Sequence, residues 1–243
     1  MGQTVQTLPR KDAAKCPINS ELSRWDATCW PSRIVRRVEL IFVRHGRPEH
    51  VVTNDGSPAD PPLSDVGHEQ AAAVADWLGE EEIHAIYSSP MQRARQTAAP
   101  IEVSLGMQAT IREGISEFDR DSVSYVPTEV LKKTDRDAWL KMASGDFMAE
   151  MGDPAAWVAH VVATVEAIVE SHPGQRVAVV CHGGVVNAYL AHCLDFAAED
   201  FMRFDVDYTS VTRCMASTRG HRSVIAINER THFRGRPGLA IRD

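Results

Sequence analysis

Hydrophobic and polar positions alternate along the chain in a way that predicts strands followed by helices. Short, almost uniformly apolar runs at 38–43 and 176–181 are typical of strands that are covered on both faces, as in a parallel sheet. Elsewhere apolar residues recur at the spacing of three and four that indicates amphipathic helices. Together these patterns predict strands and helices at 38–43, 65–79, 83–89, 90–104, 154–171, 176–181 and 185–194.

Local capping signals indicate where several helices begin. Ser64 and Asp153 each stand directly before an apolar helical pattern, and their side chains are suited to accept hydrogen bonds from a first helical turn. Ser89 followed by Pro90 predicts the N-cap and first position of the helix 90–104. We therefore expect three of the predicted helices to begin at these residues.

The order of the elements predicts the fold class. Two β-rich segments, 210–215 and 223–228, flank a polar turn and predict a late hairpin. Strands that alternate with helices indicate an α/β fold with three layers, in which an open, mostly parallel sheet has helices on both faces. Ligands of such sheets bind at the carboxyl ends of the strands. The segment 120–153 exceeds ordinary loop length, so we expect a small cap insertion over that edge.

The start of the chain has a different composition from the remainder. Residues 1–37 carry seven Lys or Arg against three Asp or Glu, with no sustained periodicity. We expect this N-terminal extension to be partly disordered. The domain itself is then expected to span residues 38–243.

Charge and cysteine content exclude several classes of protein. The 243 residues carry a net charge of −7, which argues against a protein that binds nucleic acid or acidic membrane surfaces in general. No apolar run approaches the roughly 18–20 residues of a membrane helix, and the first residues lack the apolar core of a secretory signal. Five cysteines without a C-x-x-C pair indicate reduced thiols and a cytoplasmic location. The sequence leaves open whether the chain forms a homodimer.

Charged and imidazole side chains follow the ends of the predicted strands. Arg44 and His45 end the first strand, His182 follows strand 176–181, and Arg93 lies in a first helical turn. Arg93 and the Gly183–Gly184 turn both lie at helix starts, where free N–H groups and the helix dipole favour an anion. Arginine forks match phosphoryl oxygens, so this set of residues predicts a phosphate site.

Four segments carry a resemblance to a known family. In chain order, "LIFVRHG", "PPLSDVGHEQA", "YSSPMQRARQTA" and "VAVVCHGGVVNAYL" resemble the histidine phosphatase superfamily, whose fold is phosphoglycerate-mutase-like. The resemblance implies a nucleophile at His45, phosphate-binding arginines at Arg44 and Arg93, and a second catalytic and phosphate-binding histidine at His182. Gly183, in the turn before the following helix, is expected to contribute to phosphate binding. Unlike mutase-like members, the chain continues with "RPEH" after its R-H-G tripeptide.

The general acid that the resemblance implies has two candidates. Glu113 and Glu117 both lie in "REGISEFDRD", and the apolar-x-Glu pattern of the family favours Glu117. The implied enzyme is a phosphomonoesterase of the histidine acid phosphatase type, acting on a small phosphorylated substrate. His45 would form a phosphohistidine, and Glu117 would protonate the leaving oxygen. No metal or cofactor is expected, because side chains supply the positive charge.

Other functions are compatible with parts of this pattern. A phosphoglycerate-mutase-like phosphotransferase is one, although the insert 120–153 has five Lys or Arg against seven Asp or Glu, which favours a monophosphate. A non-catalytic phosphate-binding module on the same fold is another. Two histidines and a carboxylate could also bind zinc, but Arg44 beside His45 would repel the cation. Arg112, Arg120 and Arg213 are interpreted as solvated surface charges.

Overall fold

The computed structural model describes residues 36–144 and 152–240 of the chain. The expectation of disorder in the N-terminal extension concerns residues that lie outside this described part, apart from the last two positions of 1–37. Arg37 is already part of the first strand. The strands are β1 (Arg37–Arg44), β2 (Val51–Val52), β3 (Ala85–Ser88), β4 (Thr110–Ile111), β5 (Ser124–Tyr125), β6 (Arg176–Cys181), β7 (Val211–Ser217) and β8 (Arg222–Glu229). The α-helices are α1 (Asp65–Leu78), α2 (Gln92–Leu105), α3 (Thr128–Thr134), α4 (Arg136–Ser144), α5 (Pro154–Ser171) and α6 (Gly183–Cys193).

The central sheet has six strands in the order β4-β3-β6-β1-β7-β8. Its first four strands are parallel, whereas β7 is antiparallel to β1 and forms the predicted hairpin with β8. In the register of the parallel strands, Arg44 lies beside Cys181, and Ser88 lies beside Val180. The carboxyl ends of β1, β3 and β6 therefore meet at one edge, as predicted. The mostly parallel sheet with helices confirms the predicted α/β class.

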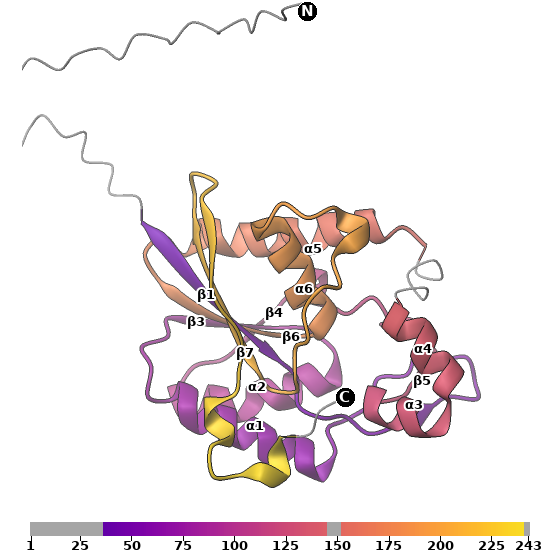
Figure 1. The fold of residues 1–243 in the computed structure, drawn as a ribbon. Coiled ribbons are helices and arrows are strands. Elements are labelled where there is room, and N and C mark those ends of the chain that lie inside the picture. The colour runs from indigo at the N-terminus through magenta and orange to yellow at the C-terminus, as the bar shows by residue number, and fades with distance from the viewer. Residues whose placement is uncertain (1–35, 145–151, 241–243) are drawn as a thin grey trace, which may run out of the picture. The chain divides into compact units, whose positions relative to one another are not determined.

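Helices cover both faces of this sheet, with α1 and α2 on one side and α5 and α6 on the other (Figure 1). Along β1 the side chains alternate between these layers. Leu40 and Phe42 belong to the core that contains α5 and α6. Ile41 and Val43 belong to the core that contains α1 and α2. All four are almost fully buried, and each such side chain stabilises the fold by roughly 1.5–3 kcal/mol.

Helix α1 is fixed to the segment that follows β1. Ser64 caps the helix as predicted, because its Oγ accepts a hydrogen bond from Gly67 N at 3.2 Å. A Cβ at Gly67 would lie 2.1 Å from the carbonyl oxygen of Arg47, and a Cβ at Gly46 would lie 2.6 Å from the carbonyl oxygen of Gly67. Only glycines permit so close an approach of the two backbones. This packing holds the chain after His45 against α1.

The start of α2 differs from its prediction. The helix begins at Gln92 rather than at residue 90, and Ser89 is not its N-cap. The backbone N–H of Gln92 instead donates to both carboxylate oxygens of Asp60, at 2.9 and 3.0 Å. A residue remote in the sequence thus caps the helix, which no local pattern indicates. Helix α6 also begins two residues before the predicted range, at Gly183.

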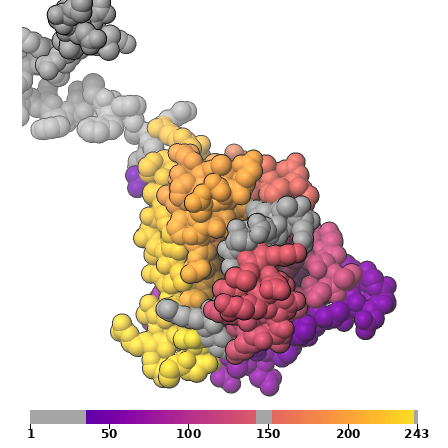
Figure 2. Space-filling model, turned by 45° about the vertical axis from the view of Figure 1, so that its right-hand side comes forward, coloured from indigo at the N-terminus to yellow at the C-terminus, as the bar shows by residue number. Residues whose placement is uncertain are grey.

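The insert between the core elements contains β5, α3 and α4. Its strand β5 pairs antiparallel with β2, which lies in the segment after β1. Glu129 of α3 accepts a hydrogen bond from Arg47 Nε at 2.6 Å and another from Tyr208 Oη at 3.3 Å. In Figure 2, α3 and α4 (rose) form part of the surface next to the violet segment that follows β1. The insert is thereby attached beside the carboxyl edge of the sheet.

Arg213 is not the solvated surface charge that the sequence predicted. Its side chain is 10% exposed and contacts three carboxylates, those of Glu39, Glu81 and Glu229. Arg176 pairs with Glu39 and Glu81 in the same network. These ion pairs lie toward the amino ends of β1 and β6, away from the edge where Arg44 lies. No helix in the described part of the chain is long and apolar enough to cross a membrane.

Candidate active site

His45 lies directly after β1 with 2% of its surface exposed. Its Nδ1 is 2.8 Å from the carbonyl oxygen of Gly46, which can only accept, so Nδ1 carries the hydrogen. Burial, together with the positive charges of Arg93 and Arg44, holds the pKa of His45 well below its ordinary value. The imidazole is therefore neutral, and the lone pair lies on Nε2. This is the state that a nucleophilic imidazole requires.

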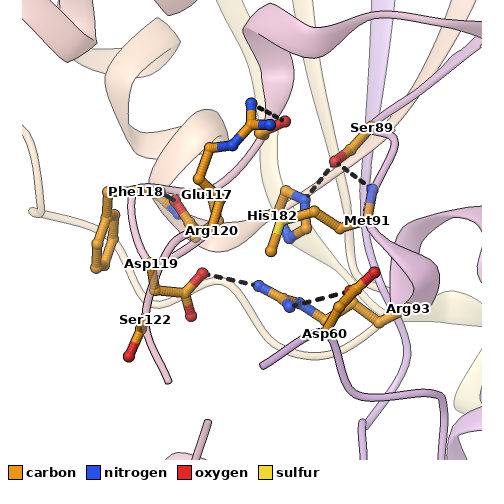
Figure 3. Close-up of polar contacts among 12 residues, drawn as sticks. Asp60, Ser89, Met91, Arg93, Glu117, Phe118, Asp119, Arg120, Ser122 and His182 are labelled. Carbon is orange, nitrogen blue, oxygen red and sulfur yellow. Dashed lines mark hydrogen bonds and ion pairs between the residues drawn. The ribbon is translucent and has the colours of Figure 1, made fainter. Parts of the chain in front are cut away.

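His182 follows β6 and lies close to His45. The two ring centroids are 5.1 Å apart. Its Nε2 is 2.8 Å from Ser89 Oγ, and the same oxygen accepts a hydrogen bond from Met91 N at 3.3 Å (Figure 3). Burial lowers the pKa of His182, and the positive charges of Arg93 and Arg44 add to this effect. The serine that the sequence assigned to a helix cap thus orients the second histidine.

The two predicted arginines approach this histidine pair from different elements. Arg44, the last residue of β1, donates from Nη1 to the carbonyl oxygen of Val206 at 2.5 Å, and its Cζ lies 4.2 Å from the centre of the Tyr208 ring. Arg93 lies in the first turn of α2, and its side chain is fully buried. Its Cζ lies 4.6 Å from the centre of the Tyr125 ring, which belongs to the insert. Both guanidinium groups therefore lie over aromatic faces, which attract their positive charge.

Several polar atoms of this cluster are buried without a hydrogen-bond partner. Within the described residues these include Nε and Nη1 of Arg93 and Nδ1 of His182. Buried polar atoms are nearly always paired, so a cluster that leaves such atoms unpaired is typical of a place where a polar ligand binds. Arginine donors favour an anion with several oxygens. The arrangement is therefore suited to a phosphoryl group.

The two candidate carboxylates lie in different environments. Glu117 is buried, and its Oε2 accepts a hydrogen bond from Gly184 N at 2.8 Å, while Oε1 accepts one from Phe118 N at 3.2 Å. A Cβ at Gly184 would lie 2.2 Å from Oε1 of Glu117, so only glycine leaves room for this carboxylate. Glu113 is exposed and forms an ion pair with Arg120 at 3.2 Å. The structure thus brings Glu117, and not Glu113, to the start of α6.

Burial also changes the acidity of Glu117. It raises the pKa of this carboxyl to about 7, with the negative charge of Asp119 as the next largest cause. The hydrogen bond from Gly184 N, the charge of Arg93 and the hydrogen bond from Phe118 N oppose this rise. A carboxyl with a pKa near neutrality can both give and take a proton at physiological pH.

At the starts of α2 and α6, one backbone N–H each is already paired with a carboxylate of the chain. Of the N–H groups that the sequence predicted to be free there for an anionic ligand, Gln92 N donates to Asp60 and Gly184 N donates to Glu117. Both groups are therefore occupied by carboxylates of the chain itself. Gly183 lies beside Arg44, because a Cβ on it would be 3.7 Å from Arg44 Nε.

Sequence reasoning missed three contributors to this site. Asp119 accepts a hydrogen bond from Arg93, the ring of Tyr125 contacts the guanidinium of Arg93, and the ring of Tyr208 contacts that of Arg44. Tyr125 and Tyr208 lie outside every motif, whereas Asp119 lies in "REGISEFDRD", and the roles of all three depend on contacts between distant segments. The position of Asp119 two residues after Glu117 is the signal that could have indicated its presence.

Two other features of the described residues bear on the site: possible metal ligands and surface grooves. None of the His, Cys, Asp and Glu side chains in 36–144 and 152–240 form a group of three or more that could hold a metal ion. A surface groove of about 720 Å³ lies along α2 and is lined by residues that include Asp60, Gln92 and Arg95. It contains neither histidine of the site, so we do not assign the chemistry to it.

Known proteins resemble this chain in sequence and in fold. The family described as histidine phosphatase superfamily (branch 1) matches residues 40–230. Phosphoserine phosphatase 1 of Hydrogenobacter thermophilus is 28% identical over 183 residues, covering 71% of this chain and 84% of that protein. Glucosyl-3-phosphoglycerate phosphatase of Mycolicibacterium vanbaalenii is 28% identical over 180 residues, covering 69% and 78%. The structure of phosphoserine phosphatase from Entamoeba histolytica with 3-phosphoglyceric acid shares the fold, with 22% identity, a TM-score of 0.63 and coverage of 80% and 98%.

Proposed function

This chain belongs to the histidine phosphatase superfamily, and we propose that it is a metal-independent phosphomonoesterase that acts through a phosphohistidine on His45. The family match and the similar proteins support phosphatase activity, without specifying its mechanism. One observation supports the finer proposal. The neutral His45 imidazole carries its lone pair on Nε2 and lies beside the buried, partly unpaired donors of Arg93 and His182.

The proposed reaction has two steps. In the first, Nε2 of His45 attacks the phosphorus atom, the bond from phosphorus to the ester oxygen breaks, and Glu117 transfers its proton to the departing oxygen. Arg44, Arg93 and His182 would hold the remaining phosphoryl oxygens while charge redistributes. In the second, water attacks the phosphorus atom, the bond from phosphorus to Nε2 of His45 breaks with release of inorganic phosphate, and the Glu117 carboxylate accepts the proton of the water. His45 and Glu117 then return to their starting states.

The charges near Arg93 favour a phosphatase over a mutase. A mutase retains and reorients a phosphorylated intermediate, so it needs additional cations around a highly anionic ligand. Asp119 contacts Arg93 Nη2 at 3.0 Å, and Asp60 lies 4.0 Å from Nη1. These carboxylates reduce the positive potential at the site, which supports a substrate with a single phosphoryl group.

We propose a small phosphorylated metabolite as the substrate and the cytoplasm as the location. The two similar phosphatases are named for phosphoserine and glucosyl-3-phosphoglycerate, and both of these esters also carry a carboxylate. The leaving group would face the insert, where Tyr125 lies over Arg93 and Glu129 pairs with Arg47. Free cysteines among the described residues, Cys181, Cys193 and Cys214, support a reducing compartment.

The test is a screen for phosphate release. The full chain would be incubated with a panel of phosphate monoesters that includes phosphoserine, glucosyl-3-phosphoglycerate and p-nitrophenyl phosphate, with and without EDTA. We expect release from at least one alkyl ester at an unchanged rate in EDTA. Loss of activity in EDTA that added metal restores would contradict metal independence. Phosphoryl transfer within a phosphoglycerate, without release, would favour the mutase alternative.

A further inference from the structure

Asp119 lies beside the arginine that would bind the phosphoryl group. It follows Glu117 by two positions, its side chain is 25% exposed, and its Oδ1 accepts a hydrogen bond from Arg93 Nη2 at 3.0 Å (Figure 3). Asp60, from the loop before α1, lies on the Nη1 side of the same guanidinium at 4.0 Å. Two carboxylates from separate loops thus flank a side chain that is itself fully buried.

The contact with Asp119 leaves Arg93 able to bind a ligand. A guanidinium carries five N–H donors, and Asp119 takes one of the two on Nη2. The second hydrogen of Nη2 remains and can act with a hydrogen on Nε or Nη1 as a bidentate fork. The ring of Tyr125 lies against the guanidinium, and the hydrogen bond to Asp119 holds one of its corners, so the two contacts together restrict its rotation. Asp119 is therefore placed to fix Arg93 without occupying all of its donors.

We propose that Asp119 is a positioning residue of this site, which holds the Arg93 guanidinium in place and disfavours the carboxylate form of Glu117 by charge repulsion. The inference rests on the proposed function, in which Glu117 is the general acid. Asp119 itself touches neither the nucleophile nor the leaving group in this account. It would act through Arg93 and Glu117.

The groups that face Glu117 support the electrostatic part. Burial is the largest cause of its raised pKa of about 7, and Asp119 makes the next largest contribution toward the protonated form. Arg93, the start of α6 at Gly184 and the backbone N–H of Phe118 act in the opposite direction. Tyr125 of the insert and Cys181 of β6 also lie nearby, and burial raises the pKa of each, so both stay neutral around pH 7.

Three variants separate the two parts of the proposal. Asp119→Asn removes the charge but keeps an oxygen that accepts from Arg93, whereas Asp119→Ala removes both the charge and the acceptor. Asp121→Asn is the matched control, because Asp121 is two residues away, 86% exposed and 3.8 Å from Arg120 rather than close to Arg93. Circular dichroism and thermal melting of each variant would verify that the fold is retained.

The first measurement titrates Glu117 directly. Protein with ¹³C-labelled Glu carboxyl groups would be followed by NMR as a function of pH, with Glu117→Gln to assign the signal. We expect the midpoint for Glu117 to fall in both Asp119 variants and to stay above the ordinary value for Glu, because burial is unchanged. A midpoint in Asp119→Asn equal to those of the wild type and of Asp121→Asn would overturn the electrostatic part. This measurement does not depend on turnover.

The second measurement uses two esters. With p-nitrophenyl phosphate, which hardly needs an acid, Asp119→Ala should lower kcat by on the order of tenfold through misplacement of Arg93, and Asp119→Asn should lose less. With an alkyl ester, kcat/KM should begin to fall at a lower pH in both variants than in the wild type. At a given pH on this alkaline limb, kcat/KM of each variant should then be lower than that of the wild type by about threefold or more. Equal kcat for Asp119→Ala and Asp121→Asn with the aryl ester would refute the positioning part. If the NMR midpoint falls but the alkaline limb does not move, the acid role of Glu117 fails while the effect of Asp119 on Glu117 stands.

Discussion

Replacing Gly184 by alanine tests whether the carboxylate of Glu117 must lie at the start of α6. The new Cβ would lie 2.2 Å from Oε1 of Glu117, 3.0 Å from its Cδ and 3.0 Å from Cδ1 of Phe118. The 2.2 Å contact is not tolerated, so the carboxylate at the end of the Glu117 side chain has to move and gives up its 2.8 Å hydrogen bond from the backbone N–H of residue 184. Because general acid assistance is typically worth about 100- to 10,000-fold, or roughly 3–5 kcal/mol, turnover of an alkyl phosphate should fall by an amount in this range.

The fold should tolerate this change. Residue 184 lies in the first turn of α6, and alanine favours a helix over glycine by roughly 0.5–1 kcal/mol in a helix interior. Backbone propensity therefore opposes any loss of stability and cannot explain a loss of activity. Gly183→Ala provides a neighbouring control, because its Cβ would make only an ordinary contact, 3.7 Å from Arg44 Nε.

The assay is phosphate release from an alkyl and an aryl ester by Gly184→Ala, Gly183→Ala, Glu117→Ala and the double variant of 184 and 117. Gly184→Ala should impair the alkyl ester far more than the aryl ester, and more than Gly183→Ala does. In the Glu117→Ala background the clash is absent, so the same change at 184 should add little. Wild-type turnover of the alkyl ester by Gly184→Ala, or a full additional loss in the double variant, would refute this reasoning.

Two further predictions address the remaining assignments. In single-turnover assays, Glu117→Gln should slow phosphorylation of the enzyme strongly with alkyl esters and much less with p-nitrophenyl phosphate. Glu113→Gln, at an exposed position, should show little dependence on the leaving group. The opposite pattern would exchange their roles. Arg93→Lys keeps the charge but loses the planar fork, so it should lower kcat/KM by roughly 30- to 1,000-fold. Arg95→Lys, at an exposed position of α2, should have little effect. The reverse order would show that the wrong arginine is assigned.

The architecture was predictable because its signals are local. The apolar run before Arg44 forms β1, and the apolar face of helix 154–171 is buried, with Val161 and Val165 fully inaccessible. Ser64 caps α1 through a contact three residues along the chain. Parallel pairing then brings residues at strand ends together, which is how Arg44 and His182 could be placed at one edge from sequence alone.

The features that the sequence did not reveal depend on contacts between distant segments. Asp60 caps α2 from a loop 32 residues earlier, so the predicted helix start was wrong by two residues. Strand β4 has only two exposed residues and pairs with β3 alone, which leaves no alternation to detect. The contact between Gly184 and Glu117 spans 67 residues. Which carboxylate reaches the start of α6 therefore became visible only in the folded chain.

Direct detection of the covalent intermediate tests the central proposal most sharply. The wild-type protein would be mixed with a ³²P-labelled monoester, quenched within milliseconds and digested to locate the label. We predict a phosphate that is labile in acid and stable in base, on the peptide that contains His45, together with loss of both the label and turnover in His45→Ala. Undiminished turnover in that variant, or rapid turnover by the wild type with no histidine-linked phosphate, would contradict the mechanism.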